Sequence, residues 1–145
     1  MDPNNPIVKL CLDGMRAEGE NRFEEARRLF TQAWDSHTDD FEACIAAHFL
    51  ARQQDNPQDM LRWNQEALAR ANAVGDERVT SFYPSLYLNL GHCHETLGDM
   101  DEAARFYGLA SQGMDQLPDT RLSGMVRGAV EAGQKRLQNE ESKEP

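Results

Sequence analysis

Residues 84–110, PSLYLNLGHCHETLGDMDEAARFYGLA, hold two amphipathic segments separated by Gly98 and Asp99. Each segment repeats apolar residues at the spacing of one helical face: Leu86, Leu90, Cys93 and Leu97 in the first, and Met100, Ala103, Tyr107 and Ala110 in the second. Gly98 suits the left-handed residue that ends a helix. Asp99 suits the cap of the next helix, with Glu102 three residues on. The stretch therefore predicts an antiparallel helical hairpin.

The same residues resemble the tetratricopeptide repeat (TPR), a 34-residue helix–turn–helix unit with the pattern W-x2-L-G-x2-Y…A-x3-F. Tyr87 stands in place of the Trp, Leu90-Gly91 match the Leu-Gly pair, and His94 replaces the Tyr. Ala103 and Tyr107 fill the A-x3-F pair.

Matching residues recur upstream. With Ile7 as the first position of an earlier repeat, equivalent places are taken by Gly14, Phe23, Ala26, Phe30 and Ala33. Asn21 is expected to be the left-handed residue of the turn between these two helices. A repeat that starts at Phe41 matches less well, because His48 replaces the glycine and Asn64 the aromatic residue. Pro57 fits the first turn of the fourth helix.

The interval from Phe41 to Pro84 is nine residues longer than one repeat. Val79, Phe82 and Tyr83 continue the apolar stripe backwards from Pro84. We therefore expect an elongated helix that begins near Asp76 or Glu77 and is bent or locally opened at Pro84. The alternative is a loop to Ser81 and a helix that starts at Pro84.

The predicted fold is all-α: a right-handed α-α superhelix, or TPR solenoid, of three helical hairpins and a C-terminal capping helix. Repeats end in atypical units that cover the last apolar face, and the last periodic segment has no partner after it. The expected organisation is a tail at 1–6, one domain at 7–138 with repeats at 7–40, 41–74 and 84–117, a cap helix at 119–138, and a disordered tail at 139–145.

Composition narrows the classes of function. The net charge of −10 argues against a nucleic-acid partner, because such partners are bound through basic patches. The sequence has no stretch of about 18 apolar residues that could span a membrane, and residues 1–10 lack the features of a secretory signal. Three cysteines in helical segments fit a reducing compartment. We expect a cytoplasmic protein.

Sequence spacing argues against a metal site or an active site. His92, Cys93, His94 and Glu95 are adjacent, and residues two apart on a helix point about 200° from each other. Cys44 and His48 have a spacing that could share a metal, but both are expected to pack between helices. No nucleophile elbow or phosphate loop is present. The sequence predicts no enzyme and no cofactor, with a small metal protein or enzyme built on Cys and His residues as the least favoured hypothesis.

The TPR resemblance implies a binding surface, because the first helices of successive hairpins line a concave groove in that family. Carried over by repeat position, the groove residues are Val8, Cys11, Met15 and Glu18, then Glu42, Ile45, Phe49 and Arg52, then Ser85, Leu88, His92 and Glu95. Asn89 resembles the groove asparagine that family members use to hold a peptide backbone. An equal alternative is that Met15, Ile45, Phe49 and Leu88 are core residues in a groove that the cap helix closes.

These observations predict a non-catalytic protein–protein interaction module, an adaptor or scaffold that binds a peptide or helix in its concave groove. The expected ligand is apolar or amphipathic, with basic residues that meet Glu18, Glu42 and Glu95. The alternative is a structural homodimer joined through the cap helix or the apolar groove.

Overall fold

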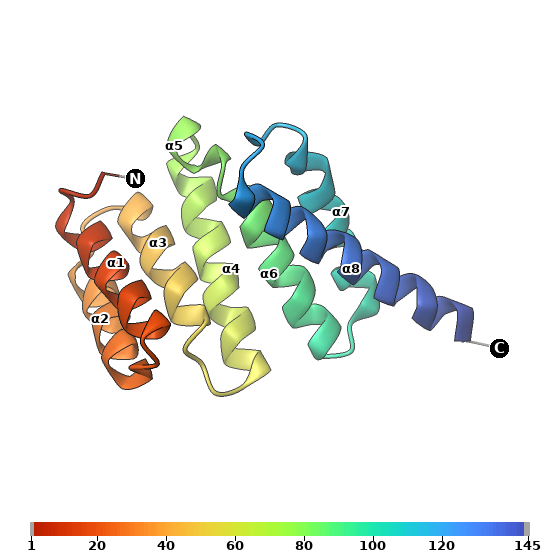
Figure 1. The fold of residues 1–145 in the computed structure, drawn as a ribbon, viewed down its shortest axis with the longest axis horizontal. Coiled ribbons are helices and arrows are strands. Elements are labelled where there is room, and N and C mark those ends of the chain that lie inside the picture. The colour runs from red at the N-terminus through yellow and green to blue at the C-terminus, as the bar shows by residue number, and fades with distance from the viewer. Residues whose placement is uncertain (1, 144–145) are drawn as a thin grey trace. The chain divides into compact units, whose positions relative to one another are not determined.

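The computed structural model of this chain describes residues 2–143, and that part is entirely helical, with eight helices and no strand (Figure 1). The predicted all-α class is confirmed. The extra element relative to the seven predicted helices is α5, a single turn at Glu77–Thr80. No helix in the described range is long and apolar enough to cross a membrane.

The described chain divides into two compact units, with the boundary between Val79 and Thr80. The sequence predicted one domain over 7–138. The division falls within the segment that exceeds the length of a repeat. In chains built of helix pairs, each pair packs mainly on its neighbours in sequence, so an insertion between pairs is where a division is least costly.

Unit 1 contains two helical hairpins. Its helices are α1 (Pro6–Gly19), α2 (Phe23–Ser36), α3 (Asp40–Ala51) and α4 (Pro57–Val74). Side chains of Asn5, Asp39 and Asn56 accept hydrogen bonds from the first-turn amides of α1, α3 and α4, respectively, and so satisfy amides that have no partner within the helix. Asn21 has a φ of 60°, as predicted for the turn between α1 and α2.

The core of unit 1 is built on aromatic contacts between its helices. α1 packs on α2 and on α3, and α3 packs on α4. The ring of Phe30 on α2 stacks on Phe49 of α3, with centroids 5.1 Å apart. Trp34 of α2 meets Trp63 of α4 edge to face at 5.0 Å. These contacts tie the two hairpins into one unit.

Unit 2 contains the third hairpin and the cap helix: α6 (Tyr83–Thr96), α7 (Met100–Met114) and α8 (Arg121–Lys143). Gly98 has a φ of 86°, and the Asp99 carboxylate accepts a hydrogen bond from the Glu102 amide, both as predicted. α8 packs against both α6 and α7. The buried ring of Tyr107 lies between Gly91 of α6 and Gly133 of α8, where neither glycine has a side chain to obstruct it.

Two predicted boundaries differ from the structure. The expected continuous helix through residues 76–84 is broken at Ser81 and Phe82, and Pro84 lies in the first turn of α6, where its missing N–H costs nothing. The tail at 139–145 was expected to be disordered, but α8 continues through Lys143 because no Gly or Pro follows Gly133 in that range; residues 144 and 145 lie outside the described part.

Candidate functional site

The C-terminal ends of α1 and α3 meet through a polar contact in unit 1. Arg52 Nη2 lies 3.1 Å from Glu18 Oε1, and Gln53 Nε2 donates a hydrogen bond to Glu18 Oε2. The Arg52 guanidinium also lies over the ring of Phe49, 5.6 Å from its centroid. Half of the Arg52 side chain stays exposed, at 49%, so a charged group faces solvent above an aromatic ring.

An apolar row on α1 continues from this polar contact. Met15 and Leu12 are 41% and 38% exposed. They lie three residues apart, and Met15 lies three residues before Glu18, so the three side chains are neighbours along one side of the helix. We call Leu12, Met15, Glu18 and Arg52 the α1–α3 ledge. It combines exposed apolar surface with a partly exposed cation.

Ile45 and Phe49, expected to face the groove, are buried instead. Phe49 is held by the stacked ring of Phe30 and by the edge of His48, at 5.0 Å. The structure therefore supports the alternative stated above for these two side chains, since they form core contacts and present little surface to a ligand. Val8 and Cys11, at the matching positions of α1, are buried as well.

Glu42, the third predicted groove position of α3, is held by groups of its own unit. Its carboxylate accepts hydrogen bonds from Asn5 Nδ2 at 2.9 Å and from the Thr38 amide at 2.9 Å. Burial opposes ionisation of this carboxyl, yet the hydrogen bonds from Asn5 and Thr38 keep the pKa of Glu42 below its usual range. The side chain joins the start of α1 to α3, which is a structural role.

Two of the predicted residues of unit 2 contact the cap helix. Leu88 packs against the cluster that contains Val126 and Val130 of α8. Glu95 accepts hydrogen bonds from Arg136 Nε and Nη2, at 2.8 and 3.0 Å, and from the Tyr107 hydroxyl at 2.7 Å. The bonds from Arg136, with that from Tyr107, hold the pKa of Glu95 below its usual range.

The remaining predicted residues of α6 are more open. His92 is exposed, and Ser85 and Asn89 are partly buried. Asn89 and His92 hold the repeat positions that Leu12 and Met15 hold in the first hairpin. The α6 face thus has a covered edge, with Leu88 and Glu95 against α8, and a more accessible polar edge.

The three carboxylates expected to receive basic ligand residues are all paired within the chain. Glu18 pairs with Arg52, Glu42 with Asn5 and Thr38, and Glu95 with Arg136 and Tyr107. A basic ligand would have to displace one of these internal partners. Sequence spacing did not reveal the pairing, because two of the three sets join separate helices far apart in sequence.

The chemistry of the described residues gives no support to a reactive site. Burial raises the pKa of the Cys11 thiol to about 12 and that of Cys44 to about 11, so neither is a ready nucleophile at neutral pH. Within residues 2–143 no cluster of three or more His, Cys, Asp or Glu side chains is placed to hold a metal ion.

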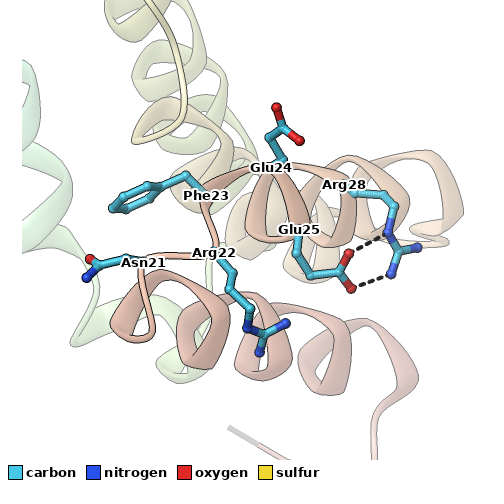
Figure 2. Close-up of a pocket in the computed structure, with 6 residues that line it drawn as sticks. All are labelled: Asn21, Arg22, Phe23, Glu24, Glu25 and Arg28. Atoms are coloured by element: carbon cyan, nitrogen blue, oxygen red, sulfur yellow. Dashed lines mark hydrogen bonds and ion pairs between the residues drawn. The ribbon is translucent and has the colours of Figure 1, made fainter.

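A surface hollow of about 570 Å³ lies at the turn between α1 and α2, and the sequence did not predict it. Figure 2 shows Phe23 and Asn21 pointing to one side, while Arg28 and Glu25 pair with each other on α2. Its lining residues are Asn21, Arg22, Phe23, Glu24, Glu25 and Arg28. All but Glu25 are exposed, so the hollow offers no buried group that would select a ligand.

Comparison of the chain with models of protein families, with curated proteins and with solved structures found no match. The functional argument therefore depends on the geometry of the chain's own residues.

Proposed function

We propose that this protein is a non-catalytic interaction module of the TPR type, which binds an amphipathic peptide or helix of a partner protein along the α1–α3 ledge. The observation that carries the proposal is the exposure of Met15 and Leu12 beside the Glu18–Arg52 pair. Apolar residues next to a partly exposed cation provide both buried area and orientation for a peptide.

The repeated hairpins support the TPR assignment. A glycine of the first helix lies directly against an aromatic ring of the second in two hairpins, Gly14 with Phe30 and Gly91 with Tyr107. The third pair of equivalent positions holds His48 and Asn64, where the larger residue is on the first helix instead. A solenoid of such hairpins presents its first helices on one side, and both exposed apolar residues of the ledge are on a first helix.

The ligand chemistry follows from what is free on the ledge. Glu18 is paired with Arg52, so its charge is already offset. Leu12 and Met15 offer contact to apolar side chains, and the flexible thioether of Met15 can adapt to different shapes. Arg52 keeps exposed N–H groups above Phe49, which suit a carboxylate or carbonyl oxygen of the ligand.

Photo-crosslinking tests this function in the full chain. A benzophenone side chain at position 15 is compared with the same group at position 32, because Gln32 is exposed on α2 away from the ledge. We expect one protein from an extract of the source cells to crosslink at position 15 and not at 32, and Arg52→Glu to remove that product. Equal labelling at both positions would count against the ledge.

Phe49→Ala and Leu88→Ala are unsuitable for this test. Both side chains pack inside their units, Phe49 on Phe30 and Leu88 on the cluster under α8. Their truncation would leave cavities and lower stability. A loss of binding in those variants would not separate recognition from folding.

A further inference from the structure

The cap helix α8 has a buried side that is fully accounted for. Val126 and Val130 pack with Ala110 and Met114 of α7, and Leu137 packs with Ala103 and Tyr107. These three residues recur at the spacing of one helical face. This side fixes α8 to its unit.

A second apolar side of α8 has no cover. Leu122 and Met125 are 68% and 65% exposed, more than any other large apolar side chain in residues 2–143. Ala129 and Ala132 follow at helical spacing and are also exposed. A large exposed apolar side chain costs solubility, so a pair of them in register with small residues marks a surface for contact.

The charges on this second side are all positive. At about 100° per residue, Arg121, Lys135 and Arg136 lie within about 60° of Ala132 on the helix surface. Between Arg121 and Gln138 the only carboxylate is Glu131, which is adjacent in sequence and so turned about 100° from Ala132. This cationic strip belongs to a chain whose net charge is −10. Arg136 is engaged with Glu95, which leaves Arg121 and Lys135 as the cations that can meet a ligand.

Gly128 lies between the apolar residues and the cations. A Cβ at this position would meet nothing within 4 Å, so no neighbour in the described chain requires a glycine here. A glycine within a helix is unfavourable for the helix itself. On a helix surface it allows another helix to approach closely, since interaxial distance depends on the side chains at the contact.

We propose that this face of α8 docks an acidic amphipathic helix of a partner protein. The apolar stripe of the partner would cover Met125, Ala129 and Leu122, and its Asp or Glu residues would meet Arg121 and Lys135. The face is separate from the α1–α3 ledge, so the proposal goes beyond the proposed function and stands or falls without it.

Charge complementarity excludes a second copy of this chain as the occupant. Two α8 helices that cross antiparallel at Gly128 place Arg121 of one opposite Lys135 of the other, and a parallel pair places each cation beside its own equivalent. Both arrangements set like charges together. A membrane surface fits less well than a helix, because the centre of the face is Gly128, Ala129 and Ala132, whereas helices that lie on membranes bury large residues such as Trp, Phe and Leu.

The test uses the full chain and fluorescence anisotropy with two labelled synthetic helical peptides. One has a Leu/Ala stripe flanked by Glu, and the other is identical except for Lys in place of Glu. We expect the acidic peptide to bind and the basic peptide not to bind. Arg121→Glu combined with Lys135→Glu should weaken the acidic peptide by about tenfold or more. Lys9→Glu, an exposed charge reversal on α1, is the matched control and should have no such effect.

Gly128→Leu gives a second readout that a simple loss of fold cannot imitate. The space at this position accepts a side chain, so helicity and thermal stability should be kept or increased while affinity for the acidic peptide falls. Gly108→Leu, at a position on α7 that is also free of neighbours, should leave the affinity unchanged.

Four results would overturn the proposal: no binding of the acidic peptide up to about 1 mM, equal binding of the basic peptide, dimerisation of the wild-type chain that Gly128→Leu abolishes, or binding to phosphatidylserine vesicles that the Arg121/Lys135 reversal abolishes. Substitution of Met15 or Arg52 should leave peptide binding at α8 unchanged. Failure here with intact crosslinking at position 15 would therefore reject this inference and leave the proposed function in place.

Discussion

Gly14 of α1 lies directly against the ring of Phe30 of α2, so that a Cβ at position 14 would come within 2.3 Å of the ring carbon Cε1. In the third hairpin a Cβ at Gly91 would come within 2.8 Å of the Tyr107 ring. The two hairpins therefore use the same device, a residue without a side chain facing an aromatic ring. It allows the two helices to pack closely.

Gly14→Ala should destabilise the protein by about 1–3 kcal/mol, because the methyl group forces the ring of Phe30 to move within a packed core. The control is Gly19→Ala at the end of the same helix, where a Cβ meets nothing within 4 Å. Urea unfolding followed by circular dichroism measures both variants. Equal stability of the two would show that the close contact is not restrictive.

Arg136 fixes the cap helix through Glu95. Arg136→Gln should increase hydrogen exchange of the α8 amides, while α1–α4 exchange as before, since the pair joins α8 to α6 within unit 2. The effect on the free energy of unfolding should stay below about 1 kcal/mol, because the arginine is about half exposed. Lys135→Gln, the adjacent cation, is the control. Unchanged exchange in α8 would contradict this role of the ion pair.

His48 should make stability depend on pH. Burial, with a contribution from the Arg52 charge, lowers its pKa from 6.5 to about 4. The unfolded chain then binds this proton more tightly than the folded protein, so stability is complete above pH 6.5 and falls as the pH drops toward 4. From pH 7.5 to 5 the loss should be about 2 kcal/mol.

Urea unfolding at the two pH values checks this, with His48→Gln as the variant that should remove most of the slope. The carboxylates of Glu42 and Glu95 also have lowered pKa values, and their contribution is lost only as the pH falls below 4.5. The range from pH 7.5 to 5 therefore isolates the histidine. A slope that persists in His48→Gln would assign it to another group.

The thiols of Cys11 and Cys44 should react slowly with a disulfide reagent at pH 8. Burial raises both pKa values, to about 12 and about 11, so the thiolate is scarce and also shielded. Addition of urea should release both at the rate of unfolding. Fast labelling of either residue in the native protein would show that its helix opens, and peptide mapping identifies which one.

Much of the fold could be predicted from local sequence signals. Helix pairs followed from apolar spacing, and the turns at Asn21 and Gly98 followed from residues that tolerate a positive φ. The cap at Asp99 followed from its short acidic side chain. These features depend on neighbours within a few residues, which is the range over which a sequence pattern is informative.

The candidate site was harder to predict, because its residues are shared between groove and core. Phe49 has the repeat position of a groove residue, but the ring of Phe30 lies within stacking distance and buries it. Glu95 is likewise paired with Arg136, which lies 41 residues later in the chain. Such contacts depend on how separate helices meet, and spacing along one helix does not report them. The exposure of Met15 beside the Glu18–Arg52 pair was equally beyond the pattern.

The most direct test of the central claim is isothermal titration of the partner identified by crosslinking at position 15 into the purified chain. The account predicts a single binding event that Met15→Ala with Arg52→Ala weakens by about tenfold or more, with circular dichroism unchanged. The control, Gln32→Ala with Arg28→Ala on α2, should bind as the wild type does. Equal affinity of the ledge variant and the wild type would contradict the assignment of the α1–α3 ledge as the binding surface.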